Sequence, residues 1–320
     1  MAEGKSLRTT SAYAIEAGIC NLNDSALLHR LRSSEEWLRW MSEELVNEIS
    51  ITLPSQEMSK KFNLRVVDGT VINEPGSTGT DWRVHYGIQL NSLRCDFFHV
   101  SPPSTGESLN LYPVEENDLI IADRGYCHRK GISHVLNQKG NVLIRFHSTS
   151  LPLFQKNGKS FNVLSQLEFL KYGEIFDEDV WFYDPNDNNK RIKGRICALK
   201  KTDEAIKKTQ KELRRKASRK GHKLRPETLE YAKYVISFTT VNRRHFKSDE
   251  IMELYRSRWQ IELVFKRLKS ILMIGHLPKK SDVSCKAWLH GKLLVALLVE
   301  RLILEAEFFS PWGYPMKSQI

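Results

Sequence analysis

Apolar residues recur at helical spacing near the two ends of the chain and at strand spacing in between. Residues 1–55 contain `NDSALLHRLRSSEEWLRWMSEELV`, in which apolar positions repeat every three or four residues. The adjacent Ser33 and Ser34 predict a break between two helices, because serine competes with the helical backbone for hydrogen bonds. This N-terminal helical segment is compatible with a DNA-binding bundle or with a packing arm, and the pattern favours neither.

Residues 60–148 have the pattern of a mixed sheet. The first part alternates apolar and polar positions in three runs, which predicts an antiparallel meander. These runs are `LRVVDGTVI`, `DWRVHYGIQL` and `RCDFFHV`. A buried strand in `NDLIIADRGY` that ends in Asp123, a helix in `GISHVLNQKG` and a strand in `NVLIRFH` should follow. The predicted fold class is therefore α/β (α+β), with a mixed sheet flanked by helices.

Residues 149–243 change in character. `DVWFYDPNDNNKRIKGRICAL` predicts a β-hairpin, and `YAKYVISFTT` predicts a further strand. Between them lies a basic helix that should begin after Thr202 and end at Gly221. Residues 200–223 hold 11 Lys/Arg and 3 Asp/Glu, a local net charge of 11 − 3 = +8. A charge run is usually a solvated face, but one so uneven in sign favours contact with phosphates.

Residues 244–320 predict helices, including a final apolar helix from about 286 to 305. The first of these helices should have Ser248 as its N-cap and contains `YRSRWQIELVFKRLK`. At about 100° per residue, four of its polar residues share one sector of the helix surface. They are Tyr255, Arg258, Glu262 and Lys269. Taken alone, this face predicts only a solvated Arg258–Glu262 ion pair worth a few tenths of a kcal/mol.

Composition narrows the class of partner. The chain has 320 residues, of which 27% are charged, and a net charge of +11, so we expect a polyanionic partner, nucleic acid before membrane. The longest apolar run near the C-terminus, `LLVALLV`, is too short to span a bilayer. Five cysteines without a CxxC pair argue against a zinc site or a disulfide scaffold and indicate a reducing compartment.

Two aspartates stand at the ends of predicted strands. Asp68 and Asp123 would emerge close together if their strands are neighbours in one sheet, and Glu262 on a helix packed against that sheet could join them. Converging carboxylates repel one another, and two Mg²⁺ ions would offset that repulsion and support phosphoryl transfer. For either aspartate alone, a turn residue before a glycine is the better interpretation. The pair together with the helix face favours a metal site.

The motifs `VVDGT`, `ADRGY` and Y-x2-R-x3-E-x6-K occur in this order. Together they resemble the DDE transposases of bacterial insertion sequences, and most closely the insertion-sequence-four family with its YREK motif. The resemblance covers roughly residues 20–305 and implies a ribonuclease-H-like core interrupted by a largely β insertion domain. The expected organisation is a helical segment, a first part of the core, the insertion and a second part of the core. The corresponding ranges are 1–55, 60–148, 149–243 and 244–320.

The resemblance also implies the roles of individual residues. The metal ligands and catalytic residues, for two Mg²⁺ ions that Mn²⁺ could replace, would be Asp68, Asp123 and Glu262. The DNA-binding residues would be Tyr255, Arg258, Lys269, Lys266, Arg145 and Tyr234. Of these, Arg145 would contact the DNA end, and Tyr234 would stack on a flipped base where relatives carry tryptophan.

The expected activity is Mg²⁺-dependent, cut-and-paste cleavage of transposon ends followed by strand transfer. The expected partner is double-stranded DNA, both the inverted-repeat ends and the target. A second copy of the chain should join it on paired ends, and no membrane is expected. The expected location is the bacterial cytoplasm, at the nucleoid. The alternative is a truncated or inactive transposase-derived DNA-binding protein, because the chain begins almost at the helical segment and stops soon after the last helix. A third option, a generic ribonuclease-H-like nuclease, is disfavoured because such an enzyme has no need of the Y-R-E-K residues.

Overall fold

The computed structural model describes residues 5–48, 61–72, 82–90, 95–256 and 258, with further helical positions near the C-terminus. These last positions are 283–284, 287–288, 290–292, 294–295, 298–299 and 301–302. The chain divides into two compact units. One comprises residues 1–54, 69–106 and 262–320, and the other comprises residues 55–68 and 107–261.

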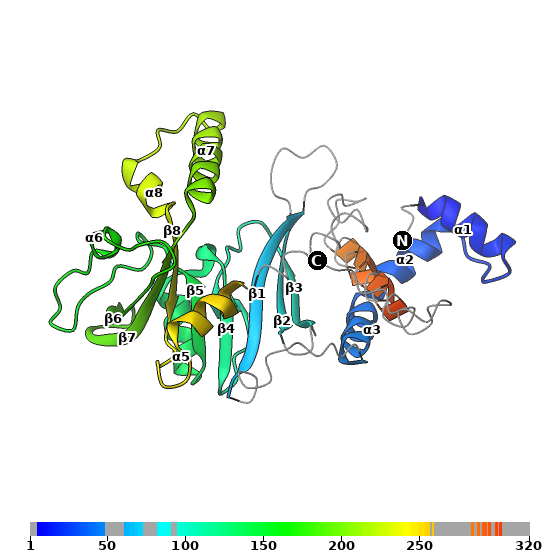
Figure 1. Cartoon of the computed structure of the whole chain (residues 1–320). Coiled ribbons are helices and arrows are strands. Elements are labelled where there is room, and N and C mark those ends of the chain that lie inside the picture. The colour runs from blue at the N-terminus through cyan, green and yellow to red at the C-terminus, as the bar shows by residue number, and fades with distance from the viewer. Residues whose placement is uncertain are drawn as a thin grey trace, which may run out of the picture. The chain divides into compact units, whose positions relative to one another are not determined.

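The N-terminal segment forms three helices, α1 Leu7–Glu16, α2 Asp24–Ser33 and α3 Glu35–Glu48 (Figure 1). The predicted break at Ser33–Ser34 is confirmed, since the Ser34 hydroxyl donates to the Leu31 carbonyl and ends α2. The first two helices are capped by polar side chains, through a hydroxyl oxygen and an amide oxygen. Ser6 accepts from the Thr9 amide, and Asn23 accepts from the Ala26 amide.

The strands form one eight-stranded sheet in the order β3-β2-β1-β4-β5-β8-β7-β6. Strand β1 is parallel to β4, and β4 is parallel to β5, whereas the pairs β2–β3, β5–β8, β8–β7 and β7–β6 are antiparallel. The strands are β1 Asn63–Ile72, β2 Trp82–Gln89, β3 Cys95–Ser101, β4 Asp118–Ala122, β5 Asn141–Arg145, β6 Ile175–Asp184, β7 Asp187–Lys200 and β8 Tyr234–Thr239. The predicted mixed α/β sheet flanked by helices is confirmed.

Strands β4 and β5 form the centre of their unit. All five residues of β4 are buried, as are Val142, Leu143 and Ile144 of β5. Helix α5 Arg129–Asn137 connects these strands and packs against β5 with Ile132 and Val135 buried. Two short 3₁₀ turns lie nearby, η1 Leu109–Leu111 and η2 Arg124–Tyr126. The connection by a helix is what two parallel neighbouring strands require.

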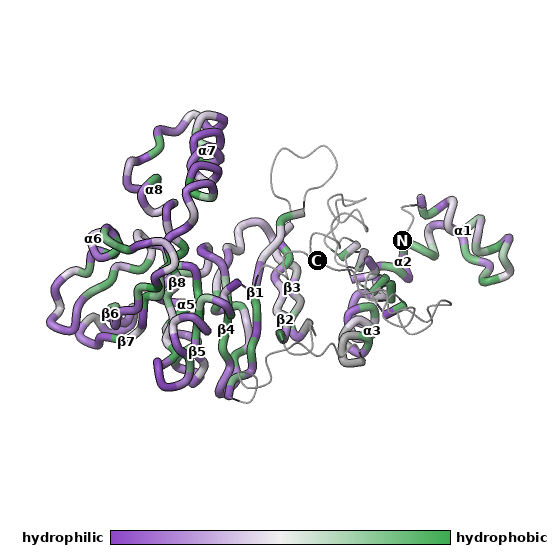
Figure 2. Tube along the Cα trace, viewed as in Figure 1, coloured by the Kyte–Doolittle hydropathy of each residue, from purple (hydrophilic) through white to green (hydrophobic). Residues whose placement is uncertain are grey.

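The strands that follow residue 149 continue the same sheet, because β8 pairs with both β5 and β7. The helices of this segment are α6 Val163–Leu167, α7 Asp203–Arg219 and α8 Pro226–Tyr231. Helix α7 begins and ends as the sequence predicts: Thr202 accepts from the Ala205 amide, and Gly221 has φ +63°. Figure 2 shows α7 as hydrophilic along its length.

A further helix runs through residues 248–256 and includes 258 among the described residues. The prediction of Ser248 as its N-cap is wrong by one residue, because Ser248 is already helical. The cap is Lys247, whose carbonyl accepts from the Ile251 amide at 3.0 Å. The Glu250 carboxylate accepts from the Lys247 amide at 2.7 Å, which is the reciprocal half of a capping box. Within the described residues, no helix has the length and apolarity needed to cross a bilayer.

Candidate active site

Three residues of interest stand in a row across neighbouring parallel strands. Val67 of β1 is paired with Ala122 of β4, which is paired in turn with Ile144 of β5. The next residues along these strands are Asp68, Asp123 and Arg145. Because neighbouring strands lie about 4.8 Å apart, the two aspartates are adjacent and the arginine is one strand further on. The strands that carry Asp68 and Asp123 are therefore neighbours, which is the condition on which the predicted proximity of the two carboxylates depends.

A pair of tyrosines holds the backbone at Asp68. The Tyr112 hydroxyl donates to the Asp68 carbonyl at 3.0 Å and lies 3.1 Å from the Tyr126 hydroxyl. Since Tyr112 has only one hydroxyl proton, Tyr126 must donate to Tyr112. Burial, the Tyr112 hydroxyl and the negative charges of Asp68 and Glu107 raise the pKa of Tyr126, so it remains protonated. No local pattern in the sequence indicates this support, because the hydrogen bond joins residues 44 positions apart.

The chain turns immediately after Asp123. The Tyr126 amide donates to the Asp123 carbonyl at 3.1 Å, which closes the turn η2. A Cβ atom at Gly125 would collide with the Glu107 carboxylate. That carboxylate is the end of a flexible side chain and could turn aside, so this contact alone does not require a glycine.

Two residues of the helix that begins at 248 reach Asp123. The Tyr255 hydroxyl lies 3.5 Å from Asp123 Oδ1, and Arg258 Nη2 lies 3.8 Å from the same oxygen. The Arg258 guanidinium also lies over the Tyr255 ring, 5.6 Å from its centroid. The Arg258 side chain is 10% exposed and that of Asp123 is 41% exposed, so a largely buried cation faces an accessible carboxylate. Burial raises the pKa of Tyr255 and keeps its hydroxyl available as a donor.

The remaining residues predicted on this helix, Glu262, Lys266 and Lys269, lie outside the described residues. Among the residues that are described, no three His, Cys, Asp or Glu side chains come together as a metal site. The oxygen donors of the two aspartates nevertheless fit a divalent cation, because carboxylate oxygens are the ligands that Mg²⁺ prefers. The approach of Arg258 to Asp123 shows that this carboxylate attracts positive charge.

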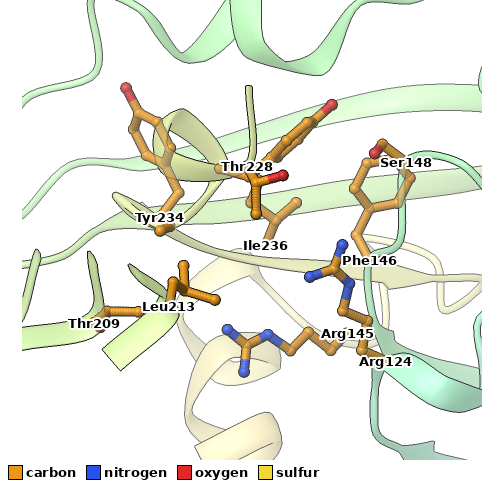
Figure 3. Close-up of a pocket in the computed structure, with 11 residues that line it drawn as sticks. Arg124, Arg145, Phe146, Ser148, Thr209, Leu213, Thr228, Tyr234 and Ile236 are labelled. Atoms are coloured by element: carbon orange, nitrogen blue, oxygen red, sulfur yellow. The ribbon is translucent and has the colours of Figure 1, made fainter. Parts of the chain in front are cut away.

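Arg145 and Tyr234, both predicted to contact DNA, line one cleft of about 100 Å³. It lies between η2 and the end of β5 on one side and α7, α8 and β8 on the other. Figure 3 shows the guanidinium groups of Arg124 and Arg145 projecting into the space bordered by Leu213 and Ile236. The lining residues are Arg124, Arg145, Phe146, Ser148, Thr209, Leu213, Thr228, Tyr231, Ala232, Tyr234 and Ile236.

The two tyrosines of the cleft differ in accessibility. Tyr234 is 6% exposed, and its hydroxyl donates to the Leu167 carbonyl at 2.9 Å. Tyr231 is only half-buried, and its ring centroid lies 6.5 Å from that of Phe146. A base that stacked in this cleft would therefore meet Tyr231 more readily than the ring of Tyr234.

Two cations of this region were not among the predicted site residues. Burial and the neighbouring charge of Arg145 lower the pKa of Arg124, and the same two causes lower the pKa of Lys201. For Arg124, its position directly after Asp123 was a signal in the sequence that it could belong to the site. Lys201 follows β7, far from Arg145 in sequence, and only the pairing of β7, β8 and β5 brings it close.

Comparison with known proteins identifies the family of the chain. Residues 99–298 match the protein family described as Transposase DDE domain. The chain is 29% identical over 313 residues to the InsL protein for insertion sequence element IS186A from Escherichia coli (strain K12), covering 96% of this chain and 83% of that protein. It is 29% identical over 311 residues to the transposase for insertion sequence element IS421 from Escherichia coli, covering 96% and 82%.

A more distant relative is the transposase for insertion sequence element IS1151 from Clostridium perfringens. It is 23% identical over 304 residues, which cover 87% of this chain and 60% of that protein. The family match includes Asp123 and spans more than half of the chain. The chain therefore belongs to the Transposase DDE domain family.

Proposed function

We propose that this chain catalyses divalent-metal-dependent cleavage of transposon ends and strand transfer by a cut-and-paste DDE mechanism. The observation that carries the proposal is the position of Asp68 and Asp123, each one residue beyond the last pair of the parallel strands β1 and β4, with Arg258 and Tyr255 at Asp123. The Y-R-E-K spacing from Tyr255 to Lys269 supports a place among the insertion-sequence-four relatives.

The metal ligands in this proposal are Asp68, Asp123 and Glu262. They would hold two Mg²⁺ ions, for which Mn²⁺ could substitute. When bound, such a pair of ions supplies Lewis-acid catalysis for in-line phosphoryl transfer. The chain itself would fix the geometry: the Tyr112–Tyr126 pair anchors the backbone at Asp68, and the 248–256 helix carries Tyr255 to Asp123.

The DNA contacts divide between the helix and the cleft. Arg258 would turn from Asp123 to a phosphate of the transposon end, because a guanidinium can bind two phosphate oxygens at once. Lys266 and Lys269 would add point charges from the same helix, together with the hydroxyl of Tyr255. In the cleft, Arg145 would contact the DNA end. A flipped base would stack on the half-buried Tyr231 in place of Tyr234, because Tyr234 is only 6% exposed.

Helix α7 supports a DNA partner over a larger area. None of its residues is buried, and residues 200–223 carry a net charge of +8. Such a surface binds the phosphate backbone without reading sequence. The DNA in this proposal comprises the inverted-repeat ends and the target. The acting species is a homodimer on paired ends, in the cytoplasm of a bacterium.

The test uses the inverted repeats that flank the coding sequence, incubated with the full chain and Mg²⁺. Release of a 3′-hydroxyl end is scored for the wild type and for Asp68→Ala, Asp123→Ala and Glu262→Ala. We expect each variant to lose cleavage and to keep its affinity for the ends, because each removes a metal ligand and no phosphate contact. Asp187→Asn, at the exposed first residue of β7, is the matched control and should cleave normally.

Mg²⁺-dependent cleavage by any of the three alanine variants would refute the assignment. A wild type that binds the ends without cleaving them would instead favour the DNA-binding relic as the function of the chain.

A further inference from the structure

Three cations gather at the cleft beside the aspartates. Arg124 and Arg145 line it, and Lys201 Nζ lies 3.4 Å from Oγ1 of the lining residue Thr209. Within the described part of the chain, no ion pair joins any of the three to a carboxylate within 4.0 Å. The cluster therefore differs from the cations of β6 and β7, where Arg195 and Lys193 are paired with aspartates.

Like charges held together in a half-buried cleft destabilise one another unless an anion joins them. The nearest anionic side chain acting on Arg124 is its own neighbour Asp123, which already faces Arg258. The rest of the lining consists of apolar side chains, two tyrosines and the hydroxyls of Ser148, Thr209 and Thr228, with no carboxylate among them. Guanidinium groups with hydroxyls nearby are donors suited to phosphate oxygens.

The position of the cluster identifies which phosphate it would meet. Arg145 is one strand away from Asp123, and Arg124 follows Asp123 directly. A DNA strand with its scissile phosphate at the two aspartates would therefore pass this cleft with a neighbouring phosphate.

We propose that Arg124 and Lys201 act with Arg145 as a three-cation clamp on a single phosphodiester next to the scissile one. This inference rests on the proposed function for the place of the DNA strand. It adds two residues to the DNA contacts and assigns all three cations to one phosphate.

The number of phosphates can be counted from the salt dependence of binding. Affinity of the full chain for a fluorescein-labelled duplex of its inverted repeat is measured by anisotropy between 50 and 200 mM KCl, without divalent ions. Loss of one phosphate contact reduces the slope of log K against log[KCl] by about 0.9, and loss of three reduces it by about 2.7. We expect the triple variant Arg124→Gln/Arg145→Gln/Lys201→Gln to show the smaller change.

The single variants test the two new residues. Lys201→Gln and Arg124→Gln should each weaken binding about tenfold, as for the loss of a charge-assisted hydrogen bond. Lys201→Arg should restore most of the affinity, which separates a lost charge from a misfolded chain. Lys139→Gln is the matched control: Lys139 is exposed and precedes β5, at the end of that strand opposite Arg145, so binding should change by less than about twofold.

Three results would overturn the clamp: an unchanged slope in the triple variant, a slope change of about 2.7 in that variant, or a Lys201→Gln effect no larger than that of Lys139→Gln. The proposed function is judged separately by cleavage in the aspartate variants. If Asp123→Ala still cleaves while the triple variant loses one phosphate contact, the catalytic assignment fails and the clamp stands. If the aspartate variants behave as expected and the slope does not change, the clamp alone fails.

Discussion

Arg258 and Asp123 face each other across 135 residues of sequence, with Arg258 Nη2 3.8 Å from Asp123 Oδ1. The sequence pattern had suggested a local partner for Arg258 one helical turn away. The observed contact instead ties the helix to the end of β4. A cation held at this distance from a proposed metal ligand must compete with a metal ion for the same oxygen.

Replacing Arg258 with glutamine should therefore separate metal binding from catalysis. Arg258→Gln removes the competing charge, so Mn²⁺ should bind about tenfold more tightly, from a Coulomb term of roughly 1–2 kcal/mol. DNA cleavage should slow at saturating metal, because a phosphate contact is lost. Calorimetric titration and the cleavage assay measure the two effects. Arg256→Gln removes an exposed arginine of the same helix and should change neither the Mn²⁺ affinity nor the cleavage rate. Equal Mn²⁺ affinity in the wild type and Arg258→Gln would contradict competition between Arg258 and the metal ion.

The Tyr112 hydroxyl should act through the backbone of Asp68. Tyr112→Phe removes the hydrogen bond to the Asp68 carbonyl, and we expect a loss of about 1 kcal/mol in unfolding free energy. The turnover number for cleavage should fall with little change in KM, because the β1 backbone at Asp68 is displaced while DNA contacts remain. Tyr126→Phe keeps the Tyr112–Asp68 bond and should lower stability alone. A rise in KM without a fall in turnover would argue against a positioning role.

The buried Arg65–Asp118 ion pair should be important for stability. Arg65 Nη1 lies 2.8 Å from Asp118 Oδ2, which also accepts from the Glu115 amide at 2.8 Å. Asp118→Ala leaves a buried guanidinium without this carboxylate, so urea unfolding should show a loss of about 3–5 kcal/mol. Glu116→Ala removes a partner from the exposed Lys139–Glu116 pair and should cost less than about 1 kcal/mol. Similar losses of unfolding free energy in Asp118→Ala and Glu116→Ala would show that burial does not determine how much an ion pair contributes to stability.

His85 should make the fold sensitive to mild acid. Burial, followed by the charges of His99 and Arg83, lowers the pKa of His85 to about 4. The unfolded chain, with a histidine pKa of 6.5, binds more protons than the folded chain below that pH. Stability should therefore be unaffected above pH 6.5 and fall as the pH decreases from 6.5 to 4, by up to about 3 kcal/mol.

Urea unfolding at several pH values measures this loss. His85→Gln should flatten the dependence, because glutamine can still hydrogen-bond with Ser101, which lies 2.9 Å from His85 Nε2. His222→Gln, at an exposed position, should leave it unchanged. A profile for His85→Gln as steep as that of the wild type would assign the acid sensitivity to other groups.

Local signals in the sequence were sufficient for most elements. Thr202 and Gly221 delimit α7 because capping depends on residues within one turn of the helix end. The same reasoning failed by one residue at Ser248, where the Glu250 carboxylate satisfies the Lys247 amide and a serine cap is not needed. The adjacency of Asp68 and Asp123 could be expected only on the condition that their strands pair, and strand order depends on the whole chain.

What the sequence could not supply is set by long-range pairing. Asp118 begins β4 and Asp123 follows it, so the two acids flank the same apolar run in the sequence. Asp118 is nevertheless buried in an ion pair with Arg65 and has a structural role. The strands from 149 to 243 extend the central sheet, and hydrophobic alternation does not specify the neighbour of a strand. Lys201 comes close to Arg145 only through that pairing, so the residues around position 201 do not reveal which other cations lie beside it.

The pairing of β8 with β5 has a consequence for synthesis of the chain. An edge strand with open backbone groups is a template for wrong partners. The ribosome completes β5 at Arg145, and β8 begins at Tyr234, so 234 − 145 = 89 residues separate the two. At about 5–20 residues per second, β5 lacks its outer partner for roughly 4–18 s on each nascent chain. The nascent chain therefore exposes an apolar strand edge for that time, and slower elongation between positions 145 and 234 should lengthen the exposure.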